Sequence, residues 1–168
     1  MFDLYSIYDP IRAEGVDTHI HQLNDFIKLY NLNLNPDYQR DHVWTLEQSG
    51  AFVYHIFSGG TTPRLYITTP DNYDSHEILD GKQRFTALFG FVEGTIPLIL
   101  PSGEHIYRDD IDPQILKVQF RRITLPFGII KQSRKQAMEL YVRLNSAGSV
   151  HTKEEIDKVK ELLNKENA

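Results

Sequence analysis

Residues 77–84 read Glu-Ile-Leu-Asp-Gly-Lys-Gln-Arg and bring carboxylates, cations and a glycine close together. The pattern predicts a strand, a tight turn at Asp80-Gly81 and the start of a helix. The first amide N–H groups of a helix favour an anion, whereas cations such as Lys82 and Arg84 in that turn oppose the helix dipole. This mismatch indicates a phosphate site in which Arg84 binds bidentately. A plain ion pair of Arg84 with Asp80 or Glu77 explains the same residues, and the sequence alone leaves both explanations open.

Two further clusters carry polar side chains of the same kind. Residues 36–44 contain Gln39, Arg40, His42 and Trp44 immediately before a helix start. His42 is a candidate general acid or base, because histidine titrates near neutral pH. The third cluster, residues 143–148, places Arg143 and Asn145 on either side of an apolar leucine and ends in a glycine typical of a helix C-terminus.

The elements that position these clusters follow from hydrophobic periodicity and capping patterns. They predict helices at 18–31, from Thr45 to Gly59, from Lys82 to Gly94, from Ser133 to Ser146 and after Thr152. They predict strands at 64–69, 77–79, 96–100 and 117–123. This mixture indicates an α+β fold, organised as one domain over residues 1–168 with a helical C-terminal part at 131–168.

Composition excludes several classes of protein. The 168-residue chain has no cysteine, which excludes disulfide frameworks, zinc fingers, iron–sulfur sites and thiol catalysis. It has neither a P-loop nor a Gly-x-Gly-x-x-Gly motif. No apolar run reaches the roughly 18 residues of a membrane span, and the N-terminus is not basic. A soluble, cytoplasmic protein is therefore expected.

The charge is unevenly distributed along a chain whose net charge is −5. Residues 115–145 contain one acid and seven basic residues, Lys117, Arg121, Arg122, Lys131, Arg134, Lys135 and Arg143. Such a segment predicts a nucleic-acid-binding face, with Arg121, Arg122, Lys131, Arg134 and Lys135 as candidate contacts. A solvated helix surface is the alternative.

The three clusters occur in an order that resembles the N-terminal domain of GmrSD-type modification-dependent restriction proteins. The resemblance covers roughly residues 18–160. The signature of that family is Asp-Gly-Gln-Gln-Arg on a ParB/sulfiredoxin-like fold, and it corresponds here to Asp80-Gly81-Lys82-Gln83-Arg84.

The resemblance implies nucleotide binding, NTP hydrolysis and a role in DNA restriction or conflict between phage and host. It assigns Gln39, Arg40, Gly81, Gln83, Arg84, Arg143 and Asn145 to nucleotide binding, with Lys82 replacing the first glutamine and Asp41-His42 departing from the usual pattern. Longer members continue into a His-Asn-His-type nuclease domain, whereas this sequence ends at Ala168. A stand-alone short member or a fragment of a longer protein is therefore expected.

The first functional hypothesis is a nucleoside-triphosphate phosphohydrolase or a nucleotide-gated sensor. Arg84 would hold the β- and γ-phosphates with help from Lys82 and Arg40, and Asp80 or Glu77 would hold Mg²⁺ or orient water. A DNA nuclease or nickase using the same pocket is a second hypothesis. A non-catalytic module that binds a separate nuclease or defence protein is a third.

Overall fold

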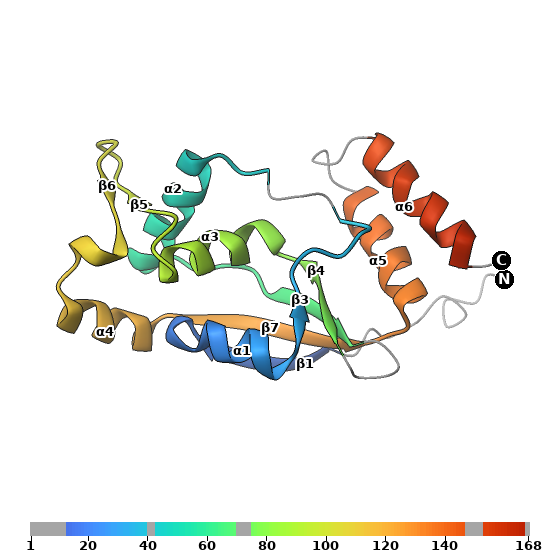
Figure 1. The fold of residues 1–168 in the computed structure, drawn as a ribbon, viewed down its shortest axis with the longest axis horizontal. Coiled ribbons are helices and arrows are strands. Elements are labelled where there is room, and N and C mark those ends of the chain that lie inside the picture. The colour runs from blue at the N-terminus through green and yellow to red at the C-terminus, as the bar shows by residue number, and fades with distance from the viewer. Residues whose placement is uncertain (1–12, 40–42, 70–74, 147–152, 167–168) are drawn as a thin grey trace, which may run out of the picture.

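The architecture is α+β, as the sequence predicts. The computed structural model describes residues 13–39, 43–69, 75–146 and 153–166 (Figure 1). In this part of the chain five strands form a mixed sheet in the order β1-β7-β3-β4-β2. Its strands are β1 (Ala13–His19), β2 (Leu32–Asn33), β3 (Leu65–Thr69), β4 (His76–Asp80) and β7 (Thr124–Lys131). β7 pairs antiparallel with β1 and parallel with β3, and β4 runs antiparallel to β3 and parallel to β2.

The larger hydrophobic core lies between one face of the sheet and the helices that precede β7. Leu65 and Ile67 of β3 and Phe127 of β7 enter this core, since alternate residues of a strand share a face. The helices that pack on them are α1 (Leu23–Leu29), α2 (Leu46–Phe57), α3 (Lys82–Val92) and α4 (Pro113–Arg122). A small hairpin of β5 (Leu98–Ile99) and β6 (His105–Ile106) extends this layer beside α2.

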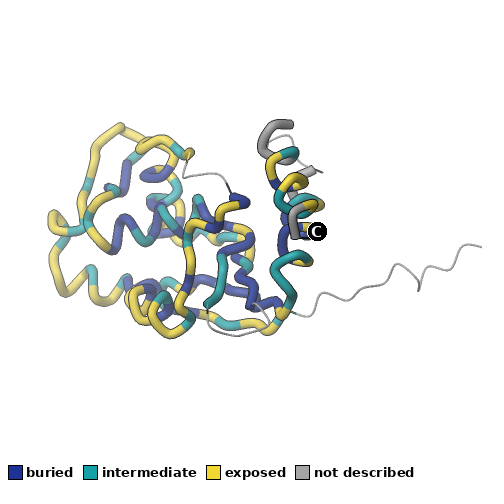
Figure 2. Tube along the Cα trace, turned by 45° about the vertical axis from the view of Figure 1, so that its right-hand side comes forward, coloured by how far each residue is buried: buried dark blue, intermediate teal, exposed yellow. Residues whose placement is uncertain are grey.

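A smaller core forms on the other side, beneath α5 (Arg134–Ser146) and α6 (Lys153–Glu166). Leu79 of β4 and Ile130 of β7 pack there against Ala137 and Tyr141 of α5. Figure 1 shows these two helices standing apart from the others, at the end of the molecule where β7 leads into α5. Figure 2 shows the buried positions running through the middle of both layers, with exposed ones on the outside.

Capping explains why the predicted helices begin where they do. Thr45 and Gln48 form a reciprocal capping box at the start of α2, and Ser133 and Gln136 exchange the corresponding hydrogen bonds at the start of α5. Beyond the end of α2, Gly59 has a positive φ of 92°. The predicted helix C-terminus at Ala147-Gly148 and the cap at Thr152 lie outside the described residues.

The strand predicted at 117–123 is wrong, because this segment belongs to helix α4. The side chain of Asp112 accepts hydrogen bonds from the amides of Gln114 and Ile115, and Pro113 occupies the first turn. An acidic N-cap followed by proline is a strong helix start. The strand begins afterwards, at Thr124.

Two other boundaries differ from the prediction. The helix expected at 18–31 is only α1, preceded by a 3-10 turn at Ile20–Gln22. Residues 18 and 19 instead end β1, an edge strand that hydrophobic patterning does not reveal. The strand expected at 96–100 is limited to β5.

Tyr38 is the more deeply buried of the two tyrosines in the smaller core, with only 2% of its surface exposed. Its ring packs edge-on against Tyr141, with ring centroids 5.6 Å apart. Burial raises the pKa of its hydroxyl, and the negative charge of Glu77 raises this pKa further. Ionisation of Tyr38 therefore opposes folding.

This predicts a loss of stability at alkaline pH that depends on Tyr38. An unfolded tyrosine ionises near pH 10. Because the pKa of Tyr38 is raised in the folded state, the stability that the neutral hydroxyl contributes is fully present below pH 10. This contribution is lost as the pH rises above 10. We measure the unfolding free energy by urea denaturation at pH 8 and at pH 11. Between these two pH values the wild type should lose about 1.4 kcal/mol more than Tyr38→Phe loses. Tyr107→Phe, at an exposed tyrosine, is the control. Equal losses in wild type and Tyr38→Phe would contradict the assignment.

Candidate functional site

The turn between β4 and α3 is built around Gly81. This residue has a φ of +89°, a conformation that favours glycine. A β-carbon at this position would lie 2.8 Å from Cγ of Leu65 and 3.2 Å from a terminal nitrogen of Arg84. The backbone therefore passes close under both side chains, and no larger residue fits without displacing them.

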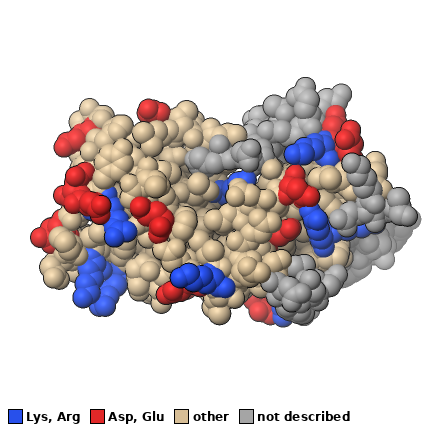
Figure 3. Space-filling view, viewed as in Figure 1, with Lys and Arg blue, Asp and Glu red and all other residues tan. Residues whose placement is uncertain are grey.

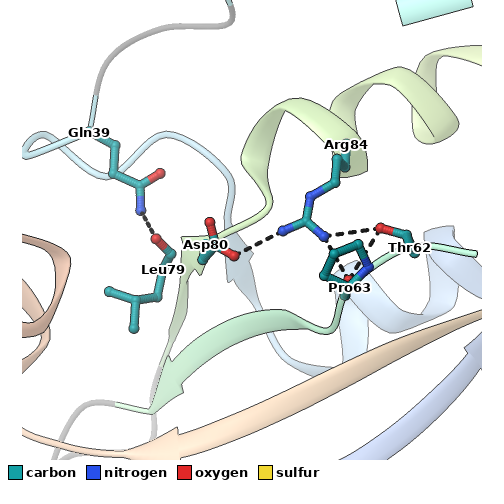
Figure 4. Close-up of polar contacts among 6 residues, drawn as sticks. All are labelled: Gln39, Thr62, Pro63, Leu79, Asp80 and Arg84. Atoms are coloured by element: carbon teal, nitrogen blue, oxygen red, sulfur yellow. Dashed lines mark hydrogen bonds and ion pairs between the residues drawn. The ribbon is translucent and has the colours of Figure 1, made fainter. Parts of the chain in front are cut away.

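Arg84 joins this turn to the segment that leads into β3 (Figure 4). One terminal nitrogen donates to Oδ2 of Asp80 at 2.9 Å. The other donates to Oγ1 of Thr62 at 3.0 Å and to the carbonyl oxygen of Pro63 at 2.6 Å. The Arg84 side chain is 16% exposed, so these charge-assisted bonds are partly shielded from water. The predicted pairing of Arg84 with Asp80 is confirmed, and Glu77 does not take part in it.

The guanidinium retains the capacity to bind a ligand. Arginine has five N–H donors, and the three bonds above leave two of them without a partner among the described residues. Asp80 is about half exposed, and its Oδ1 has no hydrogen-bond partner in the described part of the chain. Among the described residues, one carboxylate oxygen of Asp80 and two donors of Arg84 are therefore without a partner at this turn.

The N-terminus of α3 carries no side-chain cap, since Gly81 is its N-cap residue. α2, α4 and α5 are each capped by an oxygen of a side chain. Lys82, in the first turn of α3, is only 7% exposed. The uncapped amides give this helix start a positive potential, and Lys82 lies enclosed beside them.

Two glutamines hold the upstream cluster against the turn. The amide nitrogen of Gln39 donates to the carbonyl oxygens of Ile78 and Leu79, at 2.5 and 2.9 Å. Oε1 of Gln83 accepts from the backbone amides of Val43 and Trp44, at 2.9 and 3.1 Å. Trp44 itself packs against Phe52. The structure thus brings the first two predicted clusters together, with Gln39 and Gln83 as the ties between them. Arg40 and His42 lie outside the described residues.

The remaining predicted site residues are placed differently. Glu77 lies three residues before Asp80 on β4, about 10 Å away along the strand, and its charge acts on Tyr38. Arg143 is exposed on α5, and no hydrogen bond or ion pair within the described part of the chain joins it to the turn. The side chain of Asn145 lies outside the part of the chain that the structure describes.

The predicted basic face divides into two groups. Arg121 and Arg122 are exposed at the end of α4, whereas Lys131, Arg134 and Lys135 lie where β7 meets α5. β7 separates the groups by about 25 Å. Arg134 pairs with Asp37, and Lys131 pairs with Glu14 at 3.4 Å. Figure 3 shows acidic and basic side chains intermixed on the face in view, with no broad field of one sign.

The described residues bear on the expected membrane and metal properties. None of their helices combines the length and the apolar character needed to cross a membrane. They contain no group of three or more His, Asp or Glu side chains that could hold a metal ion.

Thr62 and Pro63 contact Arg84, although no sequence pattern singles them out. The Gly59-Gly60-Thr61-Thr62 segment follows a helix, which is the wrong side for a phosphate-binding loop. The contact to Arg84 spans 22 positions and depends on how β3 lies beside β4. No local pattern encodes such a contact.

Comparison with protein families identifies one match. The model of the GmrSD restriction endonuclease N-terminal domain matches residues 23–122. The comparisons with curated proteins and with solved structures find no match. The matched region contains the first two clusters, and the cluster at 143–148 lies beyond it. Because the matched region covers more than half of the chain, this protein belongs to the family of GmrSD restriction endonuclease N-terminal domains.

Proposed function

We propose that this restriction-related domain binds a nucleoside triphosphate at the turn between β4 and α3 and hydrolyses it. The observation that carries the proposal is the uncapped start of α3 beside the two donors of Arg84 that have no partner among the described residues. Amide N–H groups and a planar guanidinium match the oxygens of a phosphate chain. Phosphoryl transfer requires mainly positioning and neutralisation of charge, which such groups supply.

The residues present also fit a magnesium ion carried by the nucleotide. Mg²⁺ is commonly held by one or two carboxylates together with phosphate oxygens and water. Asp80 can supply one such oxygen, since Arg84 engages only its Oδ2. The bound ion would neutralise charge on the phosphates, while Asp80 and Arg84 hold each other in place.

Nucleotide binding should depend on Arg84 and not on the nearby exposed Arg64. At a concentration about 100 times its dissociation constant, a ligand adds about 2.7 kcal/mol of stability, which a thermal shift detects. We expect Mg²⁺ with one or more nucleoside triphosphates to stabilise the wild type and Arg64→Ala but not Arg84→Ala. Lys82→Gln, which restores the Asp-Gly-Gln-Gln-Arg signature, should retain the shift.

Circular dichroism of Arg84→Ala checks that the loss is not one of fold, because Arg84 also holds Thr62 and Pro63. Phosphate release measured on the same four proteins tests hydrolysis. A nucleotide-dependent shift or turnover that persists in folded Arg84→Ala would overturn the site. Plasmid nicking by the wild type without any nucleotide effect would favour the nuclease hypothesis instead.

A second candidate function, contact with DNA, is favoured by the cationic hollow beside α4. A cavity of about 490 Å³ is lined by Arg108, Lys117, Arg121 and His21, with Glu93 as the acidic residue in its wall. Arg121 and the adjacent Arg122 form no ion pair within the described part of the chain. Cations that are not neutralised by neighbouring carboxylates are the ones available to phosphates.

DNA affinity should therefore depend more on the end of α4 than on the start of α5. The double variant Arg121→Glu/Arg122→Glu should weaken DNA binding and reduce the slope of log K against log salt by about 2. The matched control is Lys131→Glu/Lys135→Glu, which reverses two charges at the other end of β7. Fluorescence anisotropy at several salt concentrations measures the DNA affinity and the salt slope of both double variants. Equal losses in the two double variants would contradict this placement.

A further inference from the structure

A cavity of about 580 Å³ lies beside the Arg84 contact, where α2, α4, β1 and β7 meet. Its apolar walls include the ring of Phe57 and the flat side of Pro126. Its polar groups include Asp17, Gln119, Arg122 and Thr62. The volume lies within the range of pockets that bind small molecules, and the mixture of flat apolar walls with a few polar groups is typical of them.

The wall formed by the loop after α2 is held in one conformation. The ring of His55 lies directly under Gly60, where a β-carbon would be only 2.3 Å from Cε1. Nε2 of His55 lies 3.1 Å from the carbonyl oxygen of Thr61, and the amide of Gly60 donates to the His55 carbonyl at 2.9 Å. Phe57 packs edge-on against Phe91 in the core, with centroids 4.8 Å apart. This side of the cavity therefore exists before any ligand enters.

Arg84 connects this cavity to the turn that carries the family signature. One terminal nitrogen lies beside Gly81 and bonds Asp80, and the other bonds Thr62, which lines the cavity. Arg84 therefore bonds both to the turn and to a residue that lines the cavity. A ligand with phosphates at the turn can reach the cavity with its other end.

We propose that this cavity receives the base and sugar of the nucleotide whose phosphates bind at the turn, an inference that rests on the proposed function. A planar heterocycle would pack against Phe57 and Pro126, the flat apolar residues of the lining. The carboxylate of Asp17 accepts a hydrogen bond from an amino group on the base edge. The amide of Gln119 can donate or accept there. The cavity would thus select nucleotides over free polyphosphate.

A comparison of nucleoside triphosphates with inorganic tripolyphosphate tests this inference, since tripolyphosphate has the charge but no base. Binding of each with Mg²⁺ is measured by calorimetry on the wild type and on Thr124→Trp, whose new ring would fill the cavity from its β7 side. We expect the wild type to bind the preferred nucleotide at least 10-fold more tightly than tripolyphosphate. Thr124→Trp should lose that advantage and bind tripolyphosphate unchanged. Ser102→Trp, in the exposed β5–β6 turn, is the control.

Gln119→Ala and Asp17→Asn keep the test valid if Thr124→Trp does not fold. Each should reduce nucleotide affinity several-fold or alter the order of preference among the four bases, without changing tripolyphosphate binding. Equal affinity of the wild type for nucleotide and tripolyphosphate would overturn the inference while leaving the phosphate site intact. The inference would also be overturned if all three cavity variants bound nucleotide more tightly than tripolyphosphate by the same factor as the wild type. Binding of neither ligand by the wild type would overturn the proposed function itself.

Discussion

The guanidinium of Arg84 makes the contact on which the rest of the site depends. It bonds a carboxylate at the end of one strand, and a hydroxyl and a carbonyl at the approach to the neighbouring strand. These groups come from the two ends of the chain segment that includes β3 and β4. The contact therefore ties the approach to β3 to the end of β4, beside the β4–α3 turn. Gly81 is the complementary requirement, since only a residue without a side chain leaves room for Arg84 and Leu65.

Gln39 and Gln83 hold the segment before α2 against the β4–α3 turn. Gln39 satisfies two strand carbonyls, and Gln83 satisfies two consecutive backbone amides. Each therefore uses one side chain to pair two backbone groups. The site thus combines two kinds of residue. Gln39 and Gln83 hold backbone in place, while Asp80 and Arg84 hold each other.

Sequence reasoning succeeded where local physics decides the outcome. The Thr45–Gln48 capping box and the periodic apolar residues of α3 place their helices correctly, because both signals act within one or two turns. It failed at α4, because a strand is predicted at 117–123 although Asp112-Pro113 marks a helix start. It also missed β1, whose pairing partner lies more than one hundred residues away. The contact between Arg84 and Thr62 belongs to the same class, because strand pairing creates it.

The two cores differ in size, and this difference has a consequence for how ligands act on the protein. Among the described residues the larger core contains nineteen buried side chains and the smaller one eight. A layer held by less buried apolar surface separates at a lower free-energy cost than the rest of the fold. The helix that carries Arg143 belongs to that layer. A molecule that bridged α5 and the β4–α3 turn would therefore raise the free energy of local opening more in the C-terminal helices than in the main core. The rate of amide hydrogen exchange in α5 would then report sensitively whether such a molecule is bound.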